Sequence, residues 1–501
     1  MHYLHRWIHK IAVSCLVIAI LCLSRKATHA QTPGSDTGYP AEGSWRGTLH
    51  FGAQHLAIVF HIKYDGQQYV ISSDSPDQGA YGLKGSDLKL TKDSISFNIQ
   101  QLVTYKGRFV HQDSIQGNFT QNGFSIPLGL HRSLDTATTQ ALATTRPQTP
   151  KPPFAYYSKE VVYKGAAQGL QLAATITMPS AQGHYPGVLL ITGSGAQDRD
   201  ETLFNHRPFA VLADMLTRAG YAVMRVDDRG TGQSTGNFEE ATTKDFTLDA
   251  ARSFDYLKSL PQIDSTRLGV IGHSEGGLIA EILAAQRKDL DFIILMAAPG
   301  IKISQLMSLQ NDASTKKALP SASSELLAFN SLQYKKVIEA FLSTKDTALM
   351  HQRILDSVLA VIQRPENAFF GNQVTREKVA RQNADTFFKG LTASVWTRHF
   401  MRMDPTTYIS RISPRTKVLA LNGSEDIQIL AKENLAGIQQ GLQKAGHPDF
   451  KTVELPGLNH LFQKCQQCTV QEYGRLTETL NPALLSTIKA WLLEKVPIKV
   501  K

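Results

Sequence analysis

The chain has 501 residues, of which 42% are hydrophobic and 19% are charged. This composition is typical of a globular protein with a large core, and it excludes a disordered, collagen-like or coiled-coil chain. The length predicts about two to four domains. With 53 Lys and Arg against 43 Asp and Glu, the formal net charge is +10, which first raises nucleic acid as a partner.

Residues 1–30 have the three-part pattern of a secretory signal. Arg6 and Lys10 precede an almost wholly apolar run, Ile11–Leu23, and the segment ends in the small residue Ala30. A helix over that run spans about 20 Å, which is short of the roughly 30 Å hydrocarbon core of a bilayer. We therefore expect cleavage after Ala30, a periplasmic or extracellular protein, and no stable membrane anchor afterwards.

The predicted signal also carries much of the positive charge. It contains Arg6, Lys10, Arg25 and Lys26 and no acid, so its removal lowers the formal net charge from +10 to +6. The remaining basic residues form no long run or stripe. The sequence therefore predicts no nucleic-acid partner.

Two of the four cysteines, Cys15 and Cys22, also leave with the signal. The other two form the motif C-Q-Q-C at Cys465 and Cys468. In an exported protein such a pair favours a disulfide over free thiols. Two cysteines are too few for a four-ligand zinc site, and the motif lacks the strand-to-helix setting of a redox-active pair. We expect a disulfide and no metal.

Residues 41–132 contain short alternating segments separated by Gly, Asp and Asn at roughly ten-residue spacing. This pattern predicts a small antiparallel β-barrel or sandwich, an accessory domain with no catalytic constellation. Four aromatic residues are expected in its core: Trp45, Phe60, Tyr64 and Phe97. Residues 133–153 are rich in Ser, Thr and then Pro, which predicts a linker.

In residues 154–501, apolar strands alternate with helices, which predicts a mostly parallel sheet. Residues 301–413 interrupt this alternation, because they are helix-rich and contain no convincing strand. Such an interval is too long for a loop in a compact domain. We expect an α/β domain with a helical cap inserted over the carboxyl end of the sheet.

The segment Gly272-His273-Ser274-Glu275-Gly276 matches G-x-S-x-G. An apolar strand precedes it and an apolar helix follows it, which is the context of a nucleophile elbow. A serine in such a turn projects from a strained backbone, and the helix N-terminus faces the developing oxyanion. The alternative is a glycine-rich turn with an incidental serine; the flanking elements favour the elbow, with Ser274 as nucleophile.

A serine hydroxyl needs a base, and in this topology an acid and then a histidine follow the nucleophile. The loop after one late strand offers Glu425 and Asp426, and the loop after the next offers His460. We expect His460 as the base, and we prefer Asp426 as the acid for its place in the turn and its shorter side chain. His273, inside the elbow, is expected to pack beside Ser274.

Two backbone N–H groups should form the oxyanion hole. One is expected from Glu275, directly after the nucleophile, and the other from the glycine-rich loop after the strand 187–192, where Ser194 and Gly195 are both candidates. That loop is not a phosphate cradle, because it lacks G-K-[ST] and a G-x-G-x-x-G that opens a helix.

Residues 154–495 resemble secreted bacterial α/β-hydrolases of the serine esterase type, in the EstD-like group of the broader serine-aminopeptidase-like α/β-hydrolases. The resemblance rests on I-T-G-S-G-A-Q-D-R-D, V-D-D-R-G-T-G-Q-S-T-G, G-H-S-E-G-G and L-N-H-L-F-Q. The β-rich part, with W-R-G-T-L and S-P-D-Q-G-A, resembles an accessory domain that precedes this hydrolase in some members.

The resemblance implies cleavage of a small-molecule carboxylic ester by Ser274, Asp426 and His460, without metal or cofactor. It also implies that the Asp228-Arg229-Gly230 segment is a structural loop. Thr192 departs from the family pattern, since many α/β-hydrolases have histidine before the oxyanion glycine. Two alternatives remain open: an acyl-peptide or prolyl-type peptidase or a thioesterase on the same triad, and a ligand-binding protein with an inactive hydrolase domain.

Overall fold

The computed structural model describes residues 41–51, 54–75, 80–99, 103–121, 124–133, 146–320, 322–370 and 373–498. They belong to two compact units, an N-terminal one ending before Arg146 and a second one from Arg146 onward. The predicted signal, residues 1–30, lies outside the described residues, as do residues 134–145 of the predicted linker.

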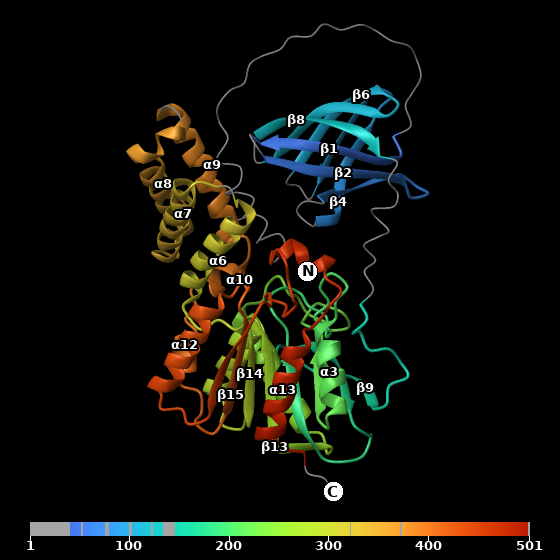
Figure 1. Ribbon diagram of the computed structural model, residues 1–501, viewed down its shortest axis with the longest axis vertical. Coiled ribbons are helices and arrows are strands. Elements are labelled where there is room, and N and C mark those ends of the chain that lie inside the picture. The colour runs from blue at the N-terminus through green and yellow to red at the C-terminus, as the bar shows by residue number, and fades with distance from the viewer. Residues whose placement is uncertain are drawn as a thin grey trace. The chain divides into compact units, whose positions relative to one another are not determined.

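The N-terminal unit is a closed barrel of eight antiparallel strands, in which each strand pairs with the next and β1 pairs with β8 (Figure 1). The all-β prediction is therefore confirmed, in its barrel form. The strands are β1 (Gly43–Phe51), β2 (Gln54–Tyr64), β3 (Tyr69–Ser75), β4 (Ala80–Leu90), β5 (Ser94–Ile99), β6 (Val103–His111), β7 (Ser114–Gln121) and β8 (Phe124–Ser133).

Side chains fill the interior of this barrel. Trp45 is fully buried, and the rings of Phe60 and Phe97 meet edge to face with centroids 4.7 Å apart. The expectation for Tyr64 is wrong: this side chain is 52% exposed. It ends β2 at the hairpin, beyond the packed interior, where its ring contacts that of Tyr69.

The second unit contains an eight-stranded sheet in the order β16-β15-β14-β13-β11-β12-β10-β9. The strands are β9 (Tyr157–Lys164), β10 (Gln171–Met178), β11 (Tyr185–Ile191), β12 (Ala222–Val226), β13 (Ile263–His273), β14 (Phe292–Met296), β15 (Lys417–Gly423) and β16 (Phe450–Leu455). β9 and β10 form an antiparallel pair, and β10 is antiparallel to β12. The remaining strands, in the spatial order β12-β11-β13-β14-β15-β16, are parallel to one another.

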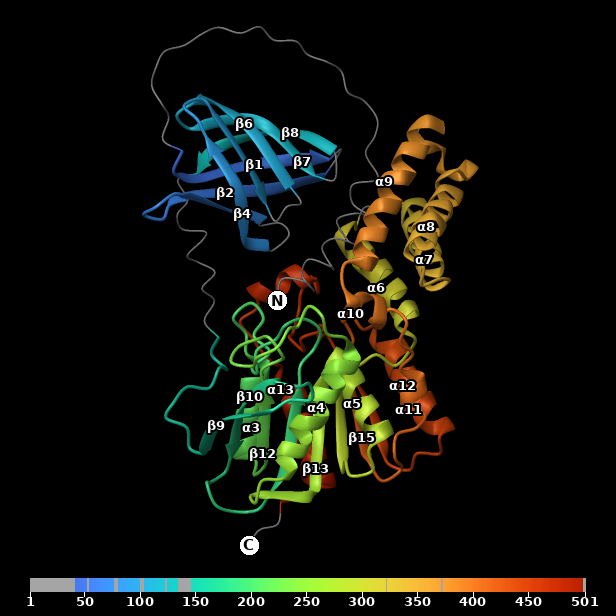
Figure 2. The ribbon, with the colours of Figure 1, turned by 180° about the vertical axis from the view of Figure 1, so that it is seen from behind.

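Helices cover both faces of this sheet, α3 and α13 on one face (Figure 1) and α4, α5 and α12 on the other (Figure 2). Successive residues of the central strands alternate between two apolar cores, so that Val188 and Leu190 face one layer and Leu189 the other. The helices are α3 (Pro208–Arg218), α4 (Thr243–Lys258), α5 (Glu275–Gln286), α12 (Ala431–Lys444) and α13 (Pro482–Lys495).

The strand order fixes where the site lies. The chain passes from β11 to β12 on one side and then returns to β13 on the other side of β11. In an open α/β sheet, ligands bind outside the carboxyl ends of the strands at such a switch point. Ile191, which ends β11, pairs with Gly272 near the end of β13, so the two following loops are neighbours. The α/β-hydrolase fold is confirmed.

A helical insertion separates β14 from β15, in the interval that the sequence assigns to a cap. Its elements are α6 (Ile303–Ala318), α7 (Ser324–Leu342), α8 (Thr347–Ile362), η3 (Pro365–Phe370), α9 (Gln373–Thr392), α10 (Val395–Phe400) and α11 (Thr406–Ile409). Tyr334 and Phe341 of α7 are buried in its core, where Tyr334 contacts Phe387 of α9 edge to face.

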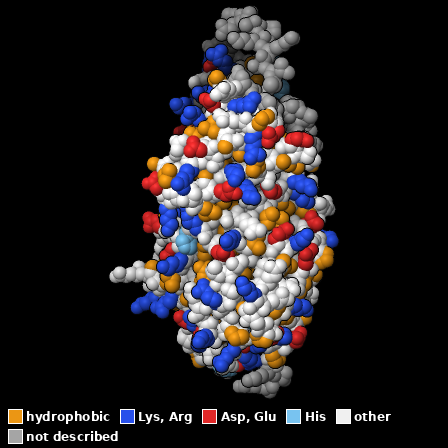
Figure 3. All heavy atoms as spheres, turned by 90° about the vertical axis from the view of Figure 1, so that its left-hand side faces the viewer, with side chains coloured by type: hydrophobic (Ala, Val, Ile, Leu, Met, Phe, Trp, Pro, Cys, Tyr) orange, Lys and Arg blue, Asp and Glu red, His pale blue; other side chains and the backbone are white. Residues whose placement is uncertain are grey.

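Charges of both signs are interspersed on the face shown in Figure 3.

Over the part of the chain that the structure describes, no helix combines the length and the apolar character needed to cross a bilayer.

Candidate active site

Ser274 lies at a sharp turn between β13 and α5. Its backbone is in a left-handed conformation, with φ 54° and ψ −118°, which a non-glycine residue adopts only at a cost. A Cβ on Gly276 would lie 2.2 Å from the carbonyl oxygen of Ile191, and one on Gly272 would lie 2.1 Å from that of Gly276. Gly272 is therefore needed for the turn to close, and Gly276 for the turn to pack against β11.

His460 and Asp426 meet in the loops that follow β16 and β15. His460 Nδ1 donates to Asp426 Oδ2 at 2.8 Å, and both side chains are buried. The other carboxylate oxygen of Asp426 accepts the N–H groups of Gln428 and Ile429, at 2.7 and 2.9 Å. Three donors thus hold the carboxylate in place and fix the orientation of the imidazole.

Glu425, the other candidate acid, points elsewhere. Its carboxylate is half exposed and lies 3.7 Å from Lys317 of α6. The structure therefore pairs Asp426, and not Glu425, with the histidine. Within the described residues, neither Ser274 Oγ nor His460 Nε2 forms a hydrogen bond, so the structure does not join the serine to the histidine and leaves both atoms unengaged.

The loop after β11 packs directly on the elbow. A Cβ on Gly193 would lie 3.3 Å from Ser274 Cβ, and Gly195 adopts a left-handed φ of 101°. The backbone N–H groups of Ser194, Gly195 and Glu275 have no hydrogen-bond acceptor among the described residues. These are the donors that the sequence assigns to the oxyanion hole, and both candidates in the loop keep a free N–H.

The side chain of Glu275 connects the elbow to the cap. Its Oε1 accepts a hydrogen bond from the Thr243 hydroxyl at 2.6 Å and from Trp396 Nε1 of α10 at 2.8 Å. Burial raises the pKa of the Glu275 carboxyl, against these hydrogen bonds. Sequence patterns gave no indication of Trp396, which lies 121 residues from Glu275.

The Asp228-Arg229-Gly230 segment supports the oxyanion loop. Asp228 accepts hydrogen bonds from the Thr192 hydroxyl at 2.8 Å and from the N–H of Gln197 at 2.9 Å. Burial raises the pKa of Asp228 to about 8. Thr192, the residue that departs from the family pattern, therefore anchors the loop through its hydroxyl. Arg229 forms an ion pair with Asp249 of α4 at 2.6 Å.

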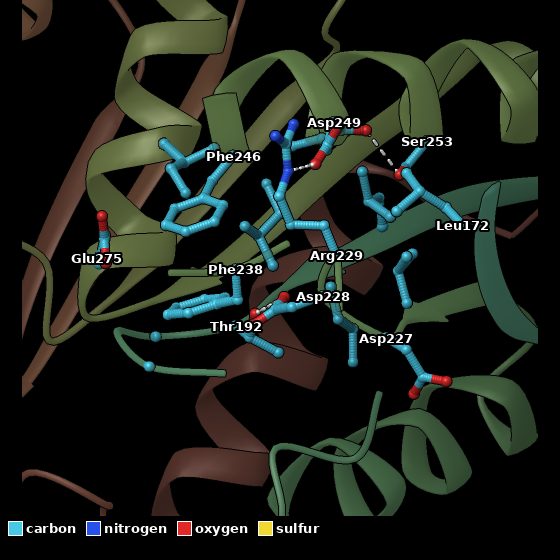
Figure 4. A pocket seen from close by; sticks show the side chains of 18 residues that line it. Leu172, Thr192, Asp227, Asp228, Arg229, Phe238, Phe246, Asp249, Ser253 and Glu275 are labelled. Atoms are coloured by element: carbon cyan, nitrogen blue, oxygen red, sulfur yellow. Dashed lines mark hydrogen bonds and ion pairs between the residues drawn. The ribbon is translucent and has the colours of Figure 1, made fainter. Parts of the chain in front are cut away.

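A pocket lies beside this loop (Figure 4). Gly193, Gly195 and Glu275 line it, whereas Ser274 and His460 do not. Phe238 and Phe246 face each other in its wall, with stacked rings 4.9 Å apart. The pocket thus adjoins the candidate oxyanion donors without containing the serine.

The loop that carries His460 continues into the C-Q-Q-C motif, and a disulfide joins Cys465 to Cys468. The Glu472 carboxylate accepts the N–H groups of Gln466, Gln467 and Cys468 at 3.0, 3.0 and 2.7 Å. Cys465, Cys468 and Glu472 lie close enough to share a metal ion. They do not fit one, because the sulfurs are bonded to each other and the carboxylate is occupied by three donors.

Residues 146–148 lie within the predicted linker 133–153 but form hydrogen bonds with the second unit, called the hydrolase unit below. Arg146 donates to the carbonyl oxygens of Phe204, Gly474 and Leu476, and Gln148 accepts the N–H groups of Thr479 and Leu480. This end of the linker therefore holds the segment that follows the disulfide. The linker's composition did not indicate this contact.

Curated relatives match part of the chain. Esterase EstD of Thermotoga maritima is 28% identical over 158 residues, which cover 32% of this chain and 36% of that protein. Putative hydrolase YtaP of Bacillus subtilis is 30% identical over 120 residues, or 21% of this chain and 40% of that protein. The chain thus spans well under half the length of these relatives. The resemblance to EstD-like hydrolases is confirmed.

Solved structures match most of the chain at low identity. A Pyrococcus furiosus esterase has a TM-score of 0.39 at 15% identity, covering 72% of this chain and 96% of its own. A proline iminopeptidase of Mycobacterium smegmatis has a TM-score of 0.39 at 14% identity, covering 67% and 98%.

The sequence profile of X-Pro dipeptidyl-peptidases (S15 family) matches residues 168–427, just over half of the chain. The match runs from β10, through the oxyanion loop and the elbow, to Asp426. The chain belongs to the X-Pro dipeptidyl-peptidase (S15) family.

Proposed function

We propose that this protein is a serine hydrolase that cleaves small-molecule carboxylic esters through an acyl-enzyme intermediate. The observation that carries the proposal is the buried Asp426–His460 pair, in which His460 Nε2 is left without a hydrogen bond. The loop of His460 packs on His273, the residue directly before the strained Ser274. A base fixed in one tautomer, a projecting nucleophile and free backbone donors are the parts that acyl transfer requires.

In the first half of the reaction, Ser274 Oγ attacks the ester carbonyl carbon while His460 Nε2 accepts the hydroxyl proton. The N–H of Glu275 and that of Ser194 or Gly195 stabilise the negative charge on the carbonyl oxygen. The bond to the alcohol oxygen then breaks, and the alcohol leaves with the proton from His460.

In the second half, water attacks the acyl-enzyme and gives a proton to His460. The bond to Ser274 Oγ breaks, the serine recovers its proton, and the carboxylic acid leaves. Asp426 keeps the imidazole oriented and stabilises the imidazolium in both halves. The chemistry that we propose uses no metal or cofactor.

We also propose that the enzyme is exported to the periplasm or beyond the cell. The proposal is supported by the signal pattern of residues 1–30 and by the Cys465–Cys468 disulfide, a bond typical of oxidising compartments.

The second candidate is a peptidase with the same triad, which the family match favours. A panel of p-nitrophenyl esters and X-Pro anilides on the purified protein separates the two. We expect turnover of esters, reduced at least about 10,000-fold in Ser274→Ala. Turnover of anilides without esters would contradict the esterase, and ester turnover that survives Ser274→Ala would contradict the mechanism.

A further inference from the structure

Behind the triad lies a buried pair that the proposed mechanism does not use. Glu201 Oε1 lies 2.9 Å from His273 Nδ1 and accepts the N–H of Gly193 at 2.7 Å. On the other side of the ring, His273 Nε2 lies 3.1 Å from the carbonyl oxygen of His460. The side chains of His273 and Glu201 are only 7% and 6% exposed.

The hydrogen-bond partners of this pair determine how many protons it holds. A backbone carbonyl only accepts, so His273 Nε2 must carry a proton to bond His460. An ionised carboxylate also only accepts, so His273 Nδ1 needs a second proton to bond Glu201. A neutral histidine beside an ionised glutamate would satisfy only one of these contacts. The geometry therefore requires one proton more than a neutral histidine and an ionised glutamate hold together. When the ring carries this proton, the two side chains form an imidazolium–carboxylate pair.

The surroundings support a cationic ring. Burial lowers the pKa of His273. The charge and the hydrogen bond of Glu201, with a smaller contribution from Asp426, together raise this pKa by more than burial lowers it, so the net direction is upward. Glu201 itself adopts a left-handed φ of 53°, a strained conformation in which its carboxylate reaches both the ring and Gly193.

Each contact of the pair reaches a different part of the site. Gly193 begins the oxyanion loop, His273 directly precedes Ser274, and the accepting carbonyl belongs to His460. The rings of His273 and His460 also pack together, with centroids 4.8 Å apart. The pair therefore connects all three loops through direct contacts.

We propose that Glu201 and His273 form a charged positioning pair that fixes three segments relative to one another. These are the oxyanion loop after β11, the elbow at Ser274 and the loop that contains His460. The inference rests on the proposed function, because it assigns these residues to the same reaction. Neither residue touches the substrate; they act through Gly193, Ser274 and His460.

The variant Glu201→Gln tests the pair, because a neutral amide cannot satisfy all three contacts. If its oxygen faces Gly193 and His273 Nδ1–H, Nε2 lacks the proton for the bond to His460. If its NH₂ group faces His273, the bond to Gly193 is lost. Either way one hydrogen bond of the pair is broken without a change in side-chain size.

We expect Glu201→Gln to lower kcat on p-nitrophenyl esters by about 10-fold to 100-fold, with KM changed by less than about threefold. The matched control is Glu281→Gln. Glu281 of α5 is fully buried, its carboxyl makes no hydrogen bond within the described chain, and burial raises its pKa well above the usual range. That exchange should leave kcat unchanged. Equal kcat values for the two variants would overturn the proposal.

The charge state has a readout that does not depend on the substrate. In protein carrying ¹⁵N-labelled histidine at pH 8, an ordinary histidine is neutral, so an imidazolium signal that His273→Gln removes belongs to His273. We expect this signal in the native protein and its loss in Glu201→Gln. A neutral His273 in the native protein would refute the charged pair, even if the ester assays support the hydrolase.

Discussion

Each of the two units holds a Ser–His–Asp set, and we propose acyl transfer for only one of them. On the barrel, Ser44 Oγ lies 2.8 Å from His61 Nδ1, and His61 Nε2 lies 2.7 Å from Asp74 Oδ2. In the hydrolase unit, Asp426 and His460 bond at 2.8 Å, and Ser274 makes no such bond. Judged by side-chain distances alone, the barrel set is the more complete of the two.

The backbone around the two serines favours the set in the hydrolase unit. Ser44 lies within β1, which pairs with β2 on one side and with β8 on the other, so backbone donors there are engaged in strand pairing. Ser274 lies at a strained turn before a helix, beside N–H groups that have no acceptor in the described part of the chain. Stabilising an oxyanion needs such donors, and the described strands around Ser44 engage theirs in pairing.

The open nitrogen is the second difference. Both ring nitrogens of His61 are occupied, and Asp74 also accepts the N–H of Gly82 at 2.7 Å, so the barrel set clamps neighbouring strands together. In the hydrolase unit, His460 Nε2 stays open for a proton. Free backbone donors and a base nitrogen without a hydrogen bond, more than three side chains in contact, are the features that we expect of a catalytic set.

We expect the largest difference in kcat between the two sets when their aspartates are replaced. We expect Asp426→Asn to lower kcat by about 1,000-fold to 10,000-fold, because an amide in this position favours the wrong tautomer of His460. Steady-state kinetics on an ester measure the loss.

The matched variant in the barrel is Asp74→Asn. It should leave kcat unchanged and lower the free energy of unfolding by about 1–3 kcal/mol, because it weakens a buried hydrogen bond. A loss of kcat in Asp74→Asn as large as that in Asp426→Asn would break the distinction between the sets.

A smaller effect concerns how the two histidines are held. His61 lies in a strand, whereas His460 lies in a loop that leads into the Cys465–Cys468 disulfide. Replacing both cysteines by serine should lower the free energy of unfolding by about 2 kcal/mol, by freeing the unfolded chain. Denaturant unfolding measures this change. Unaltered stability and unaltered kcat together would show that the disulfide does not support the loop.

Local patterns were sufficient for the main elements and for the Asp426–His460 contact, and they also select Ser274 as the candidate nucleophile. The strand, turn and helix around Ser274 are contiguous in sequence, and the alternation of residues 41–132 marks the barrel strands. Tyr64 follows the inward alternation of β2 but lies past the packed interior, which periodicity does not reveal. The pairing of Asp426 instead of Glu425 with His460 agrees with the preference for the shorter side chain.

The contacts that hold the site together could not be found in this way. Glu201 and His273 are 72 residues apart, Trp396 and Glu275 are 121 apart, and Arg146 and Leu476 are 330 apart. Each is a polar contact between distant segments, and neither hydrophobic period nor motif spacing records such a pairing. The sequence predicted the candidate triad, and the fold determines which other residues contact it.

A fluorophosphonate reacts covalently with an activated serine, so the residue that it modifies distinguishes the two sets. Peptide mass spectrometry after brief labelling should find one adduct, on Ser274, and none on Ser44. The adduct should disappear in Ser274→Ala and persist in Ser44→Ala. Labelling of Ser44, or an unlabelled Ser274 in folded protein, would contradict the claim that backbone donors and an open base make the hydrolase set the active one.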